Sequence, residues 1–158
     1  MIHTPIVTQR KRALLCAPVA LLVVSCSSTG HYPQLSAQSA AERIQKAVPQ
    51  VTRLIPLTAG NDGNHLLGQP NGYSAATVLV DSRARCPNDG PGVDCGATIE
   101  QWPDRWAAQR RADYIQQVDR PLPTVGQEWT TVRQNLLLRV TGKLNLSDAQ
   151  SYQAAFTQ

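Results

Sequence analysis

An apolar run of 12 residues, Ala13 to Val24, constrains this chain most, because it decides which residues belong to the fold. The run is interrupted only by Pro18 and follows the basic triplet Arg10-Lys11-Arg12. A helix needs roughly 20 residues to cross a membrane, so this run is too short for a permanent span. A basic start followed by a short apolar run is typical of a secretory signal peptide. We therefore expect residues 1–25 to be removed and to take no part in the fold.

The run ends in Val23-Val24-Ser25-Cys26, which resembles the lipobox of bacterial lipoproteins. In that family the cysteine thiol receives a diacylglyceryl group, and a peptidase cuts directly before the cysteine. A thiol suits this step because its thiolate is a strong nucleophile. The resemblance implies that acyl lipid on Cys26 holds the chain on the extracytoplasmic side of the cell membrane. A chance cysteine at the end of an uncleaved anchor is the alternative.

The basic charge of the chain belongs largely to this leader. The chain has 15 basic and 11 acidic residues, a net charge of +4. Three basic residues and no acidic residue lie in the leader, so 12 basic and 11 acidic residues remain from Cys26 onward. The closest basic block left is Arg110-Arg111, near Asp104 and Asp113. Nucleic acid is therefore not an expected partner.

The 133 residues from Cys26 onward suffice for one compact domain. Residues 27–38 contain Ser, Thr, Gly and Pro without periodic apolar spacing, so we expect residues 26–38 to be the lipidated cysteine and a flexible tether. Ser39 and Glu42 have the spacing of a capping box, which predicts that a helix opens a domain at residues 39–158.

Apolar patterning predicts the other elements. Alternating residues favour strands over 76–81 and 97–102, joined by a turn-rich stretch. A helix capped by Asp104 is expected to run to about Val118, with Tyr114, Ile115 and Val118 on or near its buried side. Residues 128–140 favour either one bulged strand or two segments, and residues 147–156 a last helix. The order α-β-β-α-β-α predicts a single small α+β domain, with a mostly antiparallel sheet of three to four strands and helices on one face.

Two cysteines remain in the expected domain, Cys86 and Cys95, on either side of the turn-rich stretch. Outside the cytoplasm such a pair is most simply a disulfide. A metal is not expected there, because two ligands without a nearby histidine do not make a zinc site.

Three phrases of the sequence together resemble a group of uncharacterised small secreted or lipid-anchored proteins of actinobacteria, including mycobacteria. The phrases are Asn64-His65-Leu66-Leu67-Gly68 with Asn71-Gly72-Tyr73, then Thr98-Ile99-Glu100 leading into Trp102-Pro103-Asp104, and then Asn135 to Val140. The resemblance covers roughly residues 50 to 156. It implies an envelope location and carries over no activity or catalytic residue.

The loop at residues 61–73 is the one candidate ligand site. It brings Asn61, Asp62, Asn64, His65 and Tyr73 close together among several glycines. Neither the ligand spacing of an EF-hand nor the Gly-Lys-Ser/Thr of a P-loop is present. The simpler interpretation is a folded turn in which Asn and Asp side chains satisfy backbone donors.

His65 is also the only histidine of the expected domain, so a hydrolase would have to use it as a base. Asp62 or Asp81 would orient it and Ser74 or Ser82 would be the nucleophile, but no spacing selects this set. The chain has three tryptophans, of which Trp102 and Trp106 form either part of the core or a groove for a ligand.

The leading hypothesis is a non-enzymatic envelope lipoprotein that binds a protein, wall or lipid partner and needs no cofactor beyond its covalent lipid. Three alternatives stay open: a lipid or small-molecule carrier, a secreted hydrolase that uses His65, and a phage-derived lipoprotein that excludes superinfection.

Overall fold

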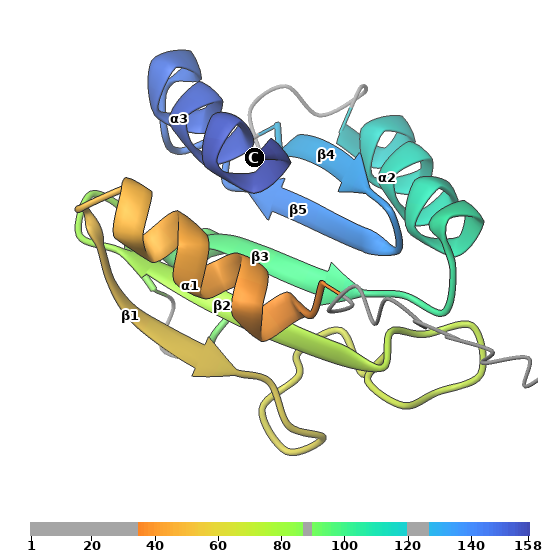
Figure 1. Ribbon diagram of the computed structural model, residues 1–158. Helices are drawn as coiled ribbons and strands as arrows, with labels where there is room; N and C mark the ends of the chain where they lie inside the picture. Colours follow the sequence, from red (N-terminus) through yellow and green to blue (C-terminus); the bar gives the residue numbers. More distant parts are fainter. Residues whose placement is uncertain (1–34, 87–89, 120–126) are drawn as a thin grey trace, which may run out of the picture. The chain divides into compact units, whose positions relative to one another are not determined.

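Residues 35–86, 90–119 and 127–158 are described by the computed structural model. The elements follow one another as α1 (Ala37–Ala47), β1 (Val51–Pro56), β2 (Ala75–Asp81), the short 3-10 helix η1 (Val93–Cys95), β3 (Gly96–Gln101), α2 (Arg105–Asp119), β4 (Trp129–Arg133), β5 (Leu136–Val140) and α3 (Leu146–Thr157) (Figure 1). The leader, Cys26 and most of the expected tether lie outside the described residues.

The strands form one sheet in the order β1-β2-β3-β5-β4, and every neighbouring pair is antiparallel. This confirms the expected small α+β domain. The sheet has five strands, however, rather than three to four. One reason is that residues 129–140 form two strands, which meet at a turn where Gln134 has a φ of 52°.

The other additional strand is β1, which no pattern in the sequence indicated. Its pairing with β2 is irregular between Val51 and Arg53, and Pro56 ends it at the edge of the sheet. A bulge disrupts the alternation of buried and exposed residues by which a strand is recognised. Edge strands also carry fewer buried side chains, and only Val51 is buried in β1.

The sheet is covered on both faces, not only on one as expected. Alternate residues of β5 divide between two core clusters: Leu136 and Leu138 pack with α1 and α3, whereas Leu137 packs with α2. In Figure 1, α1 and α3 lie side by side over the first face. The second face also receives the loop between β1 and β2, through Leu57 and Tyr73.

Two helices begin earlier than expected. Ser36 caps α1, and its side chain and that of Ser39 form a reciprocal capping box, so Ser39 is the third residue of the helix and not its cap. Asn145 caps α3 by accepting a hydrogen bond from the backbone amide of Asp148. Two polar residues near the start of each helix could cap it, Ser36 or Ser39 for α1 and Asn145 or Ser147 for α3, and the spacing alone did not identify which one does.

The buried side of α2 is narrower than expected. Ala108, Ala112 and Ile115 are buried, whereas Tyr114 and Val118 are 57% and 44% exposed. Small alanines let the helix lie close to the sheet, and this leaves the large side chains outside.

All of these helices, strands and both core clusters lie within residues 35–158, so this part of the chain contains its own complete core. None of the helices in the described part has the length and apolar character required to span a bilayer.

Candidate functional site

A buried ion pair joins the two central strands on the α2 face of the sheet. Thr98 of β3 lies opposite Arg139 of β5, so Glu100, two residues after Thr98, points to the same face. Arg139 Nη1 donates a hydrogen bond to Glu100 Oε1 over 2.7 Å. Glu100 has no exposed surface and Arg139 only 6%. A charged pair this deep in a small core is unusual, because burial of unpaired charge is costly.

The remaining polar atoms of this pair are also engaged. Arg139 donates from Nε and Nη2 to the two oxygens of Glu128, each over 2.7 Å. Trp102 donates its indole N–H to Glu100 Oε2 over 3.0 Å. Burial alone would lower the pKa of Arg139, but its hydrogen bonds to Glu128 and the charge of Glu100 raise that pKa above its ordinary value. Arg139 therefore stays cationic and fixed in orientation.

The 57–73 loop covers the same face and is organised around Asp62. The Asp62 carboxylate accepts hydrogen bonds from the backbone amides of Asn64, Leu66 and Leu67, and from the Tyr73 hydroxyl. Burial would raise the pKa of Asp62, but these donors outweigh it and hold the pKa below its ordinary value. Burial and the adjacent carboxylate raise the pKa of Tyr73, which keeps its hydroxyl protonated as a donor.

An aromatic contact and a hydrogen bond tie this loop to the ion pair. The rings of Tyr73 and Trp102 meet edge to face, with 5.7 Å between their centroids. Arg111 of α2 donates to Asn64 Oδ1 over 3.5 Å, and its Nε lies 4.0 Å from Glu100 Oε2. Loop, helix and sheet thus share one polar cluster.

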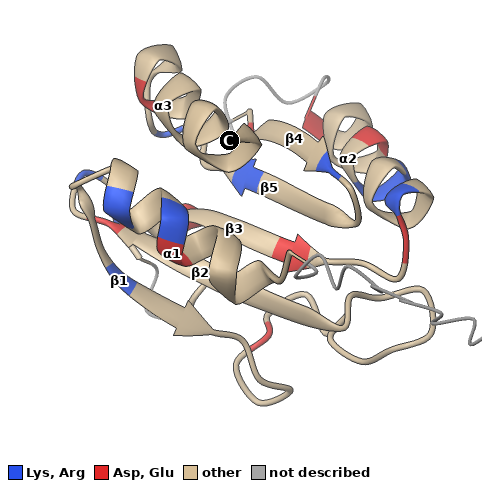
Figure 2. Ribbon diagram, viewed as in Figure 1, with Lys and Arg blue, Asp and Glu red and all other residues tan. Residues whose placement is uncertain are grey.

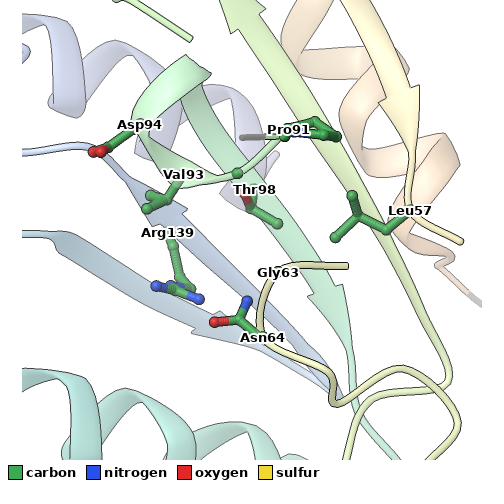
Figure 3. Close-up of a pocket in the computed structure, with 10 residues that line it drawn as sticks. Leu57, Gly63, Asn64, Pro91, Val93, Asp94, Thr98 and Arg139 are labelled. Atoms are coloured by element: carbon green, nitrogen blue, oxygen red, sulfur yellow. The ribbon is translucent and has the colours of Figure 1, made fainter. Parts of the chain in front are cut away.

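A polar cavity of about 210 Å³ opens beside this cluster, between the loop and η1. Figure 3 shows the Arg139 guanidinium and the Asn64 side chain close together at one side, with Leu57 and Pro91 at the other. Thr98 also lines the cavity, and its buried hydroxyl has no hydrogen-bond partner among the described residues. The cavity therefore offers a fixed cation, an amide and a hydroxyl to a small polar group. We call it the Arg139 cavity.

A second, larger groove of about 550 Å³ lies along α2. Leu66, Trp102 and Ala107 give it apolar surface, and Arg110 and Arg111 give it positive charge. Arg111 lines this groove while its partner Asn64 lines the Arg139 cavity, so the hydrogen bond between them separates the two.

The five residues of the candidate ligand loop have different surroundings. Asp62 and Tyr73 are buried and hold the loop, and the Asn61 side chain accepts from the backbone amide of Thr58 over 2.6 Å. Asn64 is the one that lines the Arg139 cavity. His65 is exposed, with a φ of 54°.

The set considered for a hydrolase is not brought together by any hydrogen bond of the described residues. The Asp62 carboxylate accepts the four hydrogen bonds described above. The Asp81 carboxylate lies on the opposite face of the sheet, where it accepts hydrogen bonds from Arg83 and Tyr152. Ser74 donates its hydroxyl to the Gln101 carbonyl. Trp102 is buried and lines the groove, whereas Trp106 is 73% exposed.

A disulfide joins Cys86 to Cys95, the pairing expected from the sequence. It joins the segment that follows β2 to η1, whose residues 93 and 94 line the Arg139 cavity. Within the described ranges, no group of three His, Cys, Asp or Glu side chains is placed to hold a metal ion.

Glu100, Thr98 and Arg139 were not identified as site residues from the sequence. A signal was present, since Arg139 is a charged residue inside an otherwise apolar segment and Glu100 is a charged residue inside a segment with the pattern of a strand. Such residues are rarely buried without a partner.

Comparison with known proteins does not assign a family. No family model matches the chain, and no solved structure matches it. Over 110 residues the chain is 34% identical to the vitamin B12 import ATP-binding protein BtuD of Citrobacter koseri. That alignment covers 64% of this chain and 44% of the relative, so the chain spans less than half of the relative's length.

The nucleotide-binding loop of a P-loop protein is not found in this chain. Such a loop ends in Gly-Lys-Ser or Gly-Lys-Thr, which cradle phosphate and magnesium. The single Gly-Lys of the sequence, Gly142-Lys143, is followed by Leu144. ATP binding is therefore not carried over from the relative.

Proposed function

We propose that this chain is a cell-envelope lipoprotein, anchored by lipid on Cys26 at the extracytoplasmic side of the membrane. The support is the leader, in which a basic start, a short apolar run and Cys26 follow in the order of a lipoprotein signal. The capped start of α1 at Ser36 lies only ten residues after Cys26. The domain would therefore be held close to the lipid surface.

We propose further that the domain binds a partner and is not a catalyst. The observation that carries this is the wall of the Arg139 cavity, which contains a buried guanidinium and the buried hydroxyl of Thr98, for which no partner is found among the described residues. A buried hydroxyl without a partner costs about 1–3 kcal/mol, so a ligand group that bonds to it gains binding energy. The nearby carboxylates of Asp62 and Glu100 already accept four and two hydrogen bonds, which disfavours a role as a general base.

Photocrosslinking in the native cell envelope tests this site. A crosslinking amino acid replaces Asn64 at the cavity rim and, as a matched control, Gln150 on α3; both amides are exposed. We expect adducts of a defined partner from position 64 and not from position 150. Adducts from neither position, or the same adducts from both, would contradict binding at the cavity.

A lipid or small-molecule carrier is the second candidate, and the groove along α2 is the observation that favours it. Its volume of about 550 Å³ and its apolar surface from Leu66 and Trp102 suit part of a small amphiphile. Mass spectrometry of the purified protein separates the two functions, because a carrier retains a stoichiometric lipid and a partner-binding domain does not.

A further inference from the structure

The outward side of α2 carries most of the exposed large apolar surface of the described chain. Trp106, Tyr114 and Val118 are 73%, 57% and 44% exposed, and the only other large apolar side chain of similar exposure is Leu146 on α3. Residues four apart lie next to each other on a helix, so Trp106, Arg110, Tyr114 and Val118 form one row. We call this the α2 row.

Positive charge accompanies the aromatic residues. Arg110 lies within the α2 row and Arg105 precedes Trp106 directly; neither forms an ion pair with another described residue. Figure 2 shows basic residues, coloured blue, on α2. The Arg111 guanidinium lies 5.6 Å from the Tyr114 ring centroid, which orients that ring.

The acidic residues of this segment are outside the row, and each is held by a hydrogen bond. Asp104 accepts from the backbone amide of Ala107 over 2.8 Å, Asp113 from the Gln109 side chain over 2.9 Å, and Asp119 from the backbone amide of Glu128 over 3.0 Å. The row itself therefore presents apolar rings and a cation without an acidic residue.

We propose that the α2 row docks on the membrane surface that carries the anchor, with Trp106 and Tyr114 at the depth of the lipid headgroups and Arg110 against anionic headgroups. Tryptophan and tyrosine prefer this interface because one end of each ring system is apolar and the other polar. Arginine adds attraction to anionic lipid. The orientation rests on the proposed anchor, since an unanchored domain has no fixed membrane beside it.

The chain between anchor and fold permits this contact. Ser36 lies ten positions after Cys26, a span of at most about 35 Å when fully extended. A domain of this size has a radius of gyration of about 14 Å, so any of its faces can reach the membrane. The composition of the α2 row indicates which of these faces contacts the membrane.

Attachment to vesicles through Cys26 tests the proposal without relying on cellular lipidation. The chain from Cys26 to Gln158 includes the complete described fold, and Cys86 and Cys95 are joined in a disulfide, so Cys26 alone offers a free thiol to a maleimide lipid. The vesicles contain phosphatidylglycerol and brominated phosphatidylcholine. Bromine quenches tryptophan fluorescence only on close contact, and Trp106 is the exposed tryptophan.

We expect quenching in the coupled wild type and its loss in Trp106→Phe. Arg110→Glu should lower the ratio of docked to undocked domain at least fivefold, because one arginine contributes about fivefold near an anionic surface. Leu146→Ser on α3, the matched control, should quench like the wild type. Absence of quenching in the wild type overturns the proposal, and is expected if the α2 row binds a protein partner instead of the membrane. Quenching that persists in Trp106→Phe overturns it as well. Neither result bears on lipidation of Cys26, which acyl labelling reports separately.

Discussion

Arg139 Nη1 donates a hydrogen bond to Glu100 Oε1 over 2.7 Å, and Glu100 has no exposed surface. The two residues are 39 positions apart in the chain. The pair links β3 to β5, and through Trp102, Glu128 and Arg111 it links the sheet to the loop and to α2. The candidate site therefore depends on the same interaction that holds the central strands together on this face.

Removal of one member of this pair is expected to destabilise the domain strongly. Glu100→Gln leaves the guanidinium of Arg139 buried with one carboxylate fewer, and breaking a buried pair costs about 3–5 kcal/mol. The free energy of unfolding from chemical denaturation measures this loss. Glu128→Gln is the comparison, because Glu128 is partly exposed and its loss should cost less. Equal losses of unfolding free energy in the two variants would contradict the deeper burial of Glu100.

Loss of the Tyr73 hydroxyl is expected to make the stability of the domain depend less on pH in the acid range. The folded pKa of Asp62 lies below its ordinary value, so the stability it contributes is present above the ordinary Asp range and is lost as the pH falls through the folded pKa. Tyr73→Phe removes one donor and raises that pKa toward its ordinary value, so the variant has less of this stability to lose and its difference from the wild type shrinks at low pH. At neutral pH the substitution should cost about 1.5–3 kcal/mol.

Unfolding free energies measured between neutral and acidic pH check this shift. Tyr114→Phe is the control, because Tyr114 is exposed and no hydrogen bond of its hydroxyl to a described residue is found. A Tyr73→Phe profile parallel to that of the wild type would mean that Tyr73 does not act on the Asp62 carboxylate.

Reduction of the disulfide is expected to lower stability moderately. Cys86 and Cys95 are nine positions apart, and closing a loop of this length stabilises a fold by about 2.5 kcal/mol in the chain-entropy model. Thermal melting with and without reductant measures the effect. In Cys86→Ser the reductant should change nothing, and a further decrease there would show that reductant acts elsewhere.

Two glycines of the covering loop should differ in their tolerance of a side chain. A Cβ on Gly72 would lie 1.8 Å from the Leu66 carbonyl oxygen, whereas a Cβ on Gly63 meets nothing within 4 Å. Gly72→Ala should therefore lower the melting temperature by several degrees while Gly63→Ala leaves it near the wild type. Similar melting of the two variants would contradict the close approach of residues 66 and 72.

Local patterns in the sequence predicted the elements whose side chains alternate regularly. The hairpin of β2 and β3, the apolar centre at Leu136–Leu138 and the helix that packs Tyr152 and Phe156 all follow from spacing. β1 was missed because its bulge and its exposed edge break the alternation. Tyr114 was expected on or near the buried side of α2, whereas Ala108, Ala112 and Ile115 form that side.

The candidate site was harder to predict than the fold. Asp62 and Tyr73 were recognised as neighbours in sequence, and their contact is local. The Arg139 cavity depends on which residues of β3 and β5 lie opposite each other, and this register is set by contacts far apart in the chain. The sequence shows that Glu100 and Arg139 are charged residues within strand-forming segments, but not that they are partners.

Metabolic labelling with an acyl-lipid precursor tests the central proposal, the lipid anchor, most directly. The full chain and its Cys26→Ala variant are expressed in a bacterium with lipoprotein processing, and the label and the membrane-bound fraction are compared. We expect the wild type to be labelled and retained on the membrane, and Cys26→Ala to lose both label and retention. Equal labelling and retention of the two would contradict the lipoprotein proposal.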